Sequence, residues 1–439
     1  MPQIAKVAMT FPASGRTLAP VRLAPSGLSI ASFIVGLTYT VKLSLVGEVV
    51  LAELLLPLLG LAALSRRGAQ GVLGNRAFLV LCCALLLTLA GYIASDLVAD
   101  SGAEQYLRGW GRVALVLTDF VALALLAGAQ RQTLWWFAAG MGLGRVVFLR
   151  LVMNEPLPMW KFASDYSFGY AEPITLLIIA LGGLLRPRVA SLLLVGVGLF
   201  SIQHDFRIQS AVCIAMAAVL WIRAGSVAGG SGGAGAARLV LAASVAALVL
   251  WSGLQLTADE YSEQRRGVSD IARSAGKLFA LKAIAESPLL GYGSWSRNAE
   301  FLRHQRDALD EVAGDDASAF HAGDSSSSVH SMLLQAWVEG GLFGAAFFVA
   351  LGVMILSRLP RLIFVRPLDP LYPFLLYFTF YGLWHGVMSA FAAPLRLHLA
   401  FAAAAVVCLA IEHGSRRAAF GSTRPVPPAV EARSPASGG

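Results

Sequence analysis

Apolar residues come in runs of about twenty along most of this chain, and short polar segments separate the runs. A bilayer core is crossed by about 20 helical residues, so each run predicts a transmembrane helix. About twelve spans are expected, at 27–44, 46–64, 77–97, 112–130, 133–152, 167–185, 189–205, 207–223, 238–257, 332–357, 371–390 and 395–412. The predicted fold class is all-α, a polytopic membrane protein.

Composition supports this prediction and excludes a soluble enzyme. Hydrophobic residues make up 57% of the 439 and charged residues 14%. The net charge of +8 comes largely from arginines standing singly or in pairs between apolar runs, so we expect membrane lipids around the chain and no nucleic-acid partner. The four cysteines lie in apolar runs without metal-site spacing and are expected to pack as small hydrophobes.

Arginines in alternate loops predict the orientation. By the positive-inside rule these loops and both termini are cytoplasmic. The loops are those with Arg66/Arg67/Arg76, Arg131, Arg186/Arg188, Arg223/Arg238, Arg358/Arg361/Arg366 and Arg416/Arg417. The first 25 residues lack a classical cleavage site, so the first apolar run is expected to remain as an anchor.

Four parts are expected along the chain. Residues 1–257 are transmembrane helices with a flexible Gly-rich cytoplasmic linker at 224–237. Residues 258–331 form a large outer loop, periplasmic in a Gram-negative host. Residues 332–412 return to the membrane, and 413–439 form a disordered cytoplasmic tail ending in PVPPAVEARSPASGG.

The outer loop is expected to be partly helical. Residues 267–286 can form an amphipathic helix with Arg266, Arg273 and Lys277 along one stripe. Ser287-Pro288 ends this helix, and Gly291-Tyr292-Gly293 predicts a turn. A second, more charged helix is predicted over 302–312.

His330 is the first candidate for chemistry, in VHSMLLQAWVEGGLFG at the start of a predicted span. Histidine changes charge near neutral pH, and a polar group entering a bilayer is costly without a function or a partner. A simple capping role is the competing interpretation. Gly341 and Gly344, three residues apart, would let a neighbouring helix or a lipid tail come close.

A second candidate is the segment Gln203-His204-Asp205-Phe206-Arg207 between two spans on the outer side. An arginine held there could meet a phosphate, or it could snorkel at the interface beside its aspartate. A third is the basic amphipathic helix containing Arg273, which by itself also fits a helix lying on lipid headgroups.

Together these segments resemble the O-antigen ligase and polymerase family. His330-Ser331, nine residues, Gly341, two residues and Gly344 match its signature H-[NSQ]-x9-G-x2-[GTY], and residues 272–293 match its pattern of an arginine, an amphipathic helix and a Pro-Leu-Leu-Gly-x-Gly turn. The resemblance covers about 200–412. It implies a membrane glycosyltransferase that moves a glycan from an undecaprenyl-diphosphate carrier to an acceptor at the periplasmic face of the bacterial inner membrane.

The resemblance also implies site residues. His330, Arg207 and Arg273 match the catalytic histidine, the arginine after the seventh span and the loop arginine, with Arg265 and Arg266 competing for the last role. Implied substrate-binding residues are Arg265, Arg266, Lys277, Ser331 and His204. The chain departs from the family at Ser331, where asparagine is common, and at Phe206, where serine is usual.

The implied chemistry needs these residue types. Arginines suit the negative charge that grows on the leaving diphosphate, and His330 could act as a base on the acceptor hydroxyl or hydrogen-bond the diphosphate. The donor is already activated, so no cofactor is expected. Asp315-Asp316 lacks the D-x-D spacing, so no metal is expected either.

The acceptor is expected to be a lipid A core sugar for a ligase or another lipid-linked glycan for a polymerase. The histidine signature favours the ligase. A polysaccharide-related transporter is the more distant alternative, which would show ionisable groups at mid-membrane. In this sequence the polar residues are expected to gather at the outer face instead.

Overall fold

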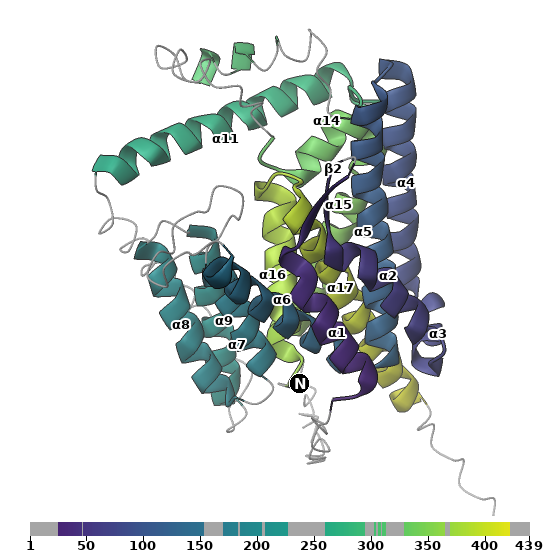
Figure 1. Ribbon diagram of the computed structural model, residues 1–439, viewed down its shortest axis with the longest axis vertical. Helices are drawn as coiled ribbons and strands as arrows, with labels where there is room; N and C mark the ends of the chain where they lie inside the picture. The colour runs from purple at the N-terminus through teal and green to yellow at the C-terminus, as the bar shows by residue number, and fades with distance from the viewer. Residues whose placement is uncertain are drawn as a thin grey trace, which may run out of the picture.

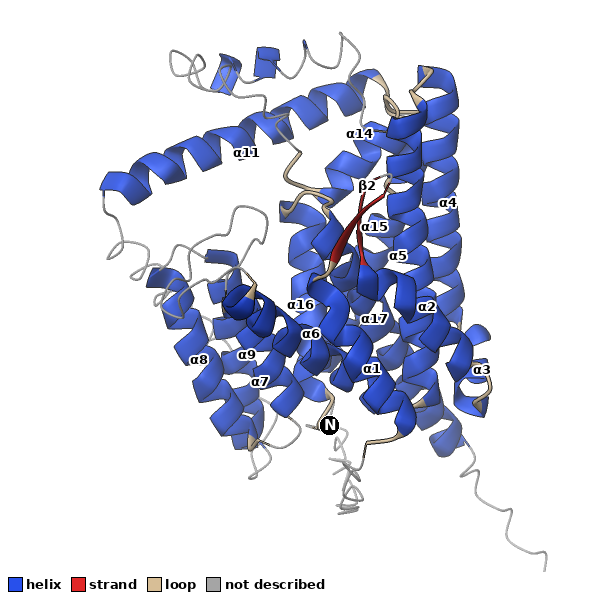
Figure 2. Ribbon diagram, in the orientation of Figure 1, coloured by secondary structure: helices blue, strands red, loops and turns tan. Residues whose placement is uncertain are grey.

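The computed structural model describes residues 25–45, 47–152, 170–182, 185–203, 207–226, 260–294, 303, 306–308, 310–312, 329–364 and 369–421. Only the backbone is described for the helical residues 203, 207–208, 225–226, 260–270, 272, 393–394 and 413–421. Helices dominate the described structure, and a two-stranded hairpin interrupts them (Figure 2). In chain order the elements are α1 (Gly27–Leu37), η1 (Thr38–Thr40), β1 (Lys42–Leu45), β2 (Gly47–Val50), α2 (Leu51–Ala63), α3 (Arg67–Leu73), α4 (Arg76–Ala99), α5 (Ala103–Ala129), α6 (Gln132–Leu151), α7 (Ala171–Leu181), α8 (Pro187–Gln203), α9 (Arg207–Ser226), α11 (Glu260–Glu286), α14 (Met332–Gly344), α15 (Ala346–Phe364), α16 (Tyr372–Met388) and α17 (Ala393–Gly421).

Among the described residues, 5 helices are long and apolar enough to cross a membrane: α4, α5, α6, α15 and the Leu395–Glu412 part of α17. A helix satisfies its own backbone hydrogen bonds, which a bilayer core demands. Apolar side chains cover the outer surface of α4, at Leu79, Val80, Leu86 and Leu87. A mainly helical structure with membrane-length helices is thereby confirmed for the described residues. The count of about twelve spans stays a prediction, and span 238–257 lies outside the described residues.

The prediction of helix across 41–50 is wrong. Here β1 and β2 form an antiparallel hairpin in which Lys42 pairs with Val50. Gly47 has a φ of 121°, a conformation that favours glycine, and so permits the reversal. Lys42 also lies 3.3 Å from the Glu48 carboxylate on the opposite strand. The predicted spans 27–44 and 46–64 therefore shrink to the shorter helices α1 and α2.

A single span over 332–357 is also wrong. The chain forms α14 and α15, and α14 itself is kinked at Gly341, where φ is 64° and ψ is −161°. At that backbone conformation a side chain would be strained, and a Cβ would overlap the Leu289 carbonyl. Gly341 thus breaks the helix axis. Helix α4 packs closely against Gly344, as expected from the sequence. A Cβ atom added to Gly91 of α4 would lie 2.7 Å from the backbone nitrogen of Gly344.

The ends of the bundle differ in character. Arg131, before α6, pairs with Glu412 of α17 at 2.8 Å, and Arg223 of α9 donates to the Phe364 carbonyl of α15 at 2.6 Å. Figure 1 shows α3 near this arginine-rich end and α11 lying across the opposite end. Of the arginines predicted to be cytoplasmic, Arg131, Arg223 and those of α3 therefore lie away from α11.

The predicted helix at 267–286 is confirmed and begins earlier, at Glu260. It ends at Glu286, before Ser287-Pro288, and the turn follows with Gly291 and Gly293 at positive φ. In the second predicted helix, the described residues 303, 306–308 and 310–312 are helical. The linker 224–237 and the tail lie outside the described residues except at 224–226 and 413–421.

Candidate functional site

His330 lies immediately before α14 and is half-buried. Its neighbour Ser331 is the N-cap of that helix, and the Ser331 hydroxyl accepts a hydrogen bond from the Leu334 N–H at 3.3 Å. Ser331 is buried and also donates to the Gly386 carbonyl at 3.5 Å, at the end of α16. The capping role therefore belongs to Ser331, which leaves the imidazole of His330 outside the helix.

Arg273 and Lys277 of α11 are the cations next to His330. They stand four residues apart and so occupy successive turns of one face. Burial first, and then the charges of Arg273 and Lys277, lower the pKa of His330 below its usual value. The Lys277 amino group lies 3.6 Å from the Met388 sulfur of α16. Residues far apart in sequence thus form one cluster, named here the His330 cluster: His330, Ser331, Arg273 and Lys277.

A small apolar core holds α11 over α14. Phe279, Ala280 and Ala283 are buried against Val329 and Val338. Hydrogen bonds close the turn after α11 onto α14: the Trp337 indole N–H donates to the Pro288 carbonyl at 2.9 Å, and the Tyr292 N–H donates to the Val338 carbonyl at 2.8 Å. The turn predicted from sequence therefore fixes the helix that carries both cations.

The side chains of the remaining predicted site residues lie outside the described part of the structure. Arg207 is the first residue of α9, but its side chain lies outside the described residues, as does all of His204. Arg265 and Arg266 fall within α11, and only their backbone is described. Their roles stay predictions.

Behind the cluster lies a buried polar network that the sequence analysis missed. The Glu339 carboxylate of α14 forms an ion pair with Arg112 of α5 and accepts hydrogen bonds from the Tyr92 hydroxyl at 2.8 Å and the Gln335 amide at 3.0 Å. The Gln335 oxygen in turn accepts from the Phe391 N–H at 2.9 Å. The presence of Glu339 within an apolar run is the sequence feature that could have indicated this network. The network fixes α14 against α4, α5 and the segment before α17.

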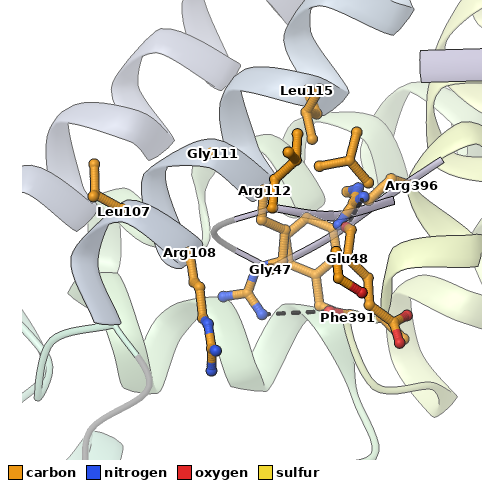
Figure 3. Close-up of a pocket in the computed structure, with 13 residues that line it drawn as sticks. Gly47, Glu48, Leu107, Arg108, Gly111, Arg112, Leu115, Phe391 and Arg396 are labelled. Carbon is orange, nitrogen blue, oxygen red and sulfur yellow. Dashed lines mark hydrogen bonds between the residues drawn. The ribbon is translucent and has the colours of Figure 1, made fainter. Parts of the chain in front are cut away.

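A cavity of about 450 Å³ lies beside Phe391 and Ala392, in the segment between α16 and α17. The hairpin, the first turns of α5 and the start of α17 line it, and the segment before α17 contributes Phe391 (Figure 3). Three arginines, Arg108, Arg112 and Arg396, are among the lining residues. Helix α5 begins at Ala103 and not at 112 as predicted, so Arg108 lies on the helix and the cavity was not expected from the sequence.

Ion pairs also lie deep inside the bundle, which corrects the expectation that polar residues gather at the outer face. Glu172 of α7 is 2.8 Å from the Arg145 guanidinium and 2.7 Å from the His398 imidazole. Arg396 is 2.6 Å from Glu53 of α2. All five side chains are buried. Each charge has its partner on another helix, as the cost of burying an unpaired charge requires.

The His330 cluster can hold an anion and move a proton. A cationic pair attracts phosphate, and a histidine with a lowered pKa is neutral at neutral pH and can accept a proton. Comparison of the chain with protein-family models, with curated proteins and with solved structures gives no match. The likeness to the O-antigen ligase and polymerase family therefore rests on the residues named above.

Proposed function

We propose that this protein transfers a glycan from an undecaprenyl-diphosphate carrier to an acceptor sugar at the periplasmic face of the bacterial inner membrane. The observation that carries the proposal is the His330 cluster, in which two cations of α11 lie beside the one histidine of the predicted signature. The lipid-A-core ligase is the preferred form, because the signature matches that of the ligases more fully. A polymerase acting on a lipid-linked acceptor is the alternative within the family.

The reaction follows from the cluster's chemistry. The acceptor hydroxyl oxygen attacks the anomeric carbon, a new glycosidic bond forms, and the bond to the diphosphate breaks. Undecaprenyl diphosphate leaves with the electron pair, and Arg273, Lys277 and Arg207 stabilise its charge. The hydroxyl proton goes to the neutral imidazole of His330. A preorganised cation of this kind contributes about 3 kcal/mol to lowering the barrier.

The test is glycan transfer by the full-length protein in nanodiscs, with a lipid-diphosphate-linked glycan as donor and lipid A core as acceptor. His330→Ala is expected to lose about 10²–10⁴ in rate, as is typical on loss of a general base. Arg273→Ala is expected to lose transfer and Arg273→Lys to restore little of it, because lysine lacks the bidentate fork. The matched control is Arg303→Ala, an exposed arginine of the same outer region, which should keep wild-type transfer.

Ligase and polymerase are distinguished by the acceptor. Transfer to lipid A core supports the ligase, and elongation of the lipid-linked glycan without lipid A core supports the polymerase. Near wild-type transfer by His330→Ala and Arg273→Ala with either acceptor would remove the proposal.

One observation favours a second candidate, a proton-coupled transporter. The Arg145–Glu172–His398 group is buried within the helices, where ionisable residues commonly mark ion or proton pathways. Proton uptake by sealed proteoliposomes containing the protein tests this candidate. A Glu172-dependent proton flux that Arg273→Ala leaves intact supports transport, whereas loss of transfer with no such flux supports the transferase.

A further inference from the structure

The cavity beside α5 has a polar wall and an apolar wall. Arg112 and Arg396 form the inner part of the polar wall and are almost fully buried. Each is held in place: the Arg112 guanidinium donates to the Phe391 carbonyl at 3.3 Å, and Arg396 donates to the Glu48 carbonyl at 2.7 Å. Arg112 and Arg396 form ion pairs with Glu339 and Glu53. Their positive charges are therefore largely neutralised, and their guanidinium groups are held in fixed positions.

Arg108 is different, because its guanidinium can leave its ion-pair partner and bind another anion at little energetic cost. Its side chain is 40% exposed, and its ion-pair partner is Glu104, one turn earlier on the same helix. Such a surface pair contributes only about 0.3–0.5 kcal/mol, so an anion in the cavity can compete for the guanidinium. Figure 3 shows Arg108 and Arg112 projecting from the same helix at the cavity.

The apolar wall reaches the outside of the bundle. Leu45 of the hairpin and Leu107 of α5 line the cavity, and they are 65% and 45% exposed. These two exposed leucines give this edge of the cavity an apolar surface against which a lipid chain can lie. The cavity therefore joins a polar interior, lined by three arginines and Glu48, to an exposed apolar edge.

We propose that this cavity binds the phosphate-bearing headgroup of an anionic lipid. The phosphate contacts Arg108 within reach of Arg112, and the first part of the lipid chain lies against Leu45 and Leu107. A volume of about 450 Å³ is within the usual range for small-molecule sites, about 300–1,000 Å³. The site is separate from the His330 cluster, and its occupancy is measured without turnover, so the proposal does not depend on glycan transfer.

Gly111 offers a way to fill the cavity without changing its charge. It lines the cavity, and a Cβ built there meets no atom within 4 Å. Gly111→Leu therefore places a side chain in open space, and leucine also favours the helix over glycine. Gly352 of α15 is a matched control, because it is also a helical glycine whose Cβ meets nothing within 4 Å.

The experiment measures binding of dihexanoyl phosphatidic acid, dihexanoyl phosphatidylcholine and inorganic phosphate to the full-length protein in neutral detergent by calorimetry. Wild type is expected to bind phosphatidic acid more tightly than the other two. Arg108→Ala and Gly111→Leu are each expected to weaken that binding about tenfold or more, as loss of a charge-assisted contact or of the space predicts. Gly352→Leu and Arg131→Ala, whose side chain is 45% exposed and also paired, should keep wild-type affinity.

The remaining outcomes overturn the proposal. Equal affinity for inorganic phosphate and phosphatidic acid means an anion site without a lipid. Undetectable phosphatidic acid binding, or wild-type binding by Arg108→Ala, means that the cavity is not the site. If Gly111→Leu loses its thermal unfolding transition, Arg108→Ala decides the result, because its exposed side chain contributes little to folding.

Discussion

The Tyr92 hydroxyl donates a hydrogen bond of 2.8 Å to the Glu339 carboxylate and so joins α4 to the helix that begins just after Ser331. The same carboxylate balances the buried charge of Arg112. The position of the His330 cluster therefore depends on a glutamate about two turns into α14.

Glu339→Gln is expected to destabilise the protein far more than Tyr92→Phe. The first leaves the Arg112 guanidinium buried without its counter-charge, at a cost of about 3–5 kcal/mol. The second removes one hydrogen bond to a charged group, about 1.5–3 kcal/mol. Thermal unfolding in detergent measures both. Equal losses would contradict the assignment of Glu339 as the counter-ion of Arg112.

Glu53 and Arg396 are expected to be strongly coupled. Their two hydrogen bonds, at 2.6 and 2.7 Å, are buried, so either Glu53→Leu or Arg396→Leu leaves an unpaired charge and should cost about 3–5 kcal/mol. The double variant Glu53→Leu/Arg396→Leu should lose less than the sum of the two. A double-mutant cycle on unfolding temperatures measures the coupling, and strict additivity would contradict it.

The titration of His330 should respond to Lys277. Burial and the two α11 cations lower the pKa of His330, so the folded protein holds this imidazole neutral to lower pH than the unfolded chain does. As pH falls from about 6.5 to the folded pKa, the unfolded state binds more protons and stability decreases. Lys277→Ala should raise the pKa of His330 in the folded protein. The pH range over which protonation of His330 destabilises the fold should therefore become narrower. Modification of His330 by diethyl pyrocarbonate, which requires the neutral ring, followed by mass spectrometry across pH measures the shift; Arg303→Ala is the control and should leave it unchanged.

Gly341→Ala should disrupt the break in α14. The backbone there has a conformation that side chains rarely adopt, and a Cβ would lie 2.7 Å from the Leu290 nitrogen as well as overlapping the Leu289 carbonyl. We expect a loss of at least about 1–3 kcal/mol from backbone strain alone. Gly352→Ala in α15 is the control and should be neutral or stabilising, because its Cβ meets open space. Expression level and unfolding temperature report the difference.

The two ends of the bundle should lie on opposite sides of the membrane. In a cysteine-free background, Glu286→Cys at the end of α11 should react with a membrane-impermeant thiol reagent in intact spheroplasts, and Arg67→Cys in α3 should not. Removal of Cys83 matters here, because its thiol is exposed on α4. The reverse labelling would place the His330 cluster in the cytoplasm and exclude the proposed function.

Local sequence patterns predict a large part of this fold. The long apolar runs predict α4 and α6 closely, because hydrophobic length and helical hydrogen bonding are properties of one segment. Ser287-Pro288 likewise predicts the end of α11, because the residue before a proline is biased away from the helical conformation by a local steric clash. The face of α11 that carries Arg273 and Lys277 follows from helical periodicity alone.

Other features depend on partners that the local pattern cannot identify. The two strands of the hairpin have only four residues each, too short a stretch for the spacing of apolar residues to distinguish a strand from a helix. A glycine at position 341 shows that the helix can break there. The close approach of the turn after α11, whose Leu289 carbonyl lies where a Cβ of residue 341 would be, cannot be predicted from the local sequence. Glu339 could be recognised as unusual, but its partner Arg112 is 227 residues away in sequence.

The pairing of α2 with α17 has a consequence for synthesis of the chain. Arg396 lies 343 residues after Glu53, and at about 5–20 residues per second the ribosome needs about 17–70 seconds to reach it. Throughout that interval Glu53 has been made and its cationic partner has not. Burial of α2 is therefore unfavourable until the last helix supplies the guanidinium that balances the Glu53 charge. A chain that stops before α17 would retain an unpaired acid in α2, a feature by which cellular quality control could recognise it as incomplete.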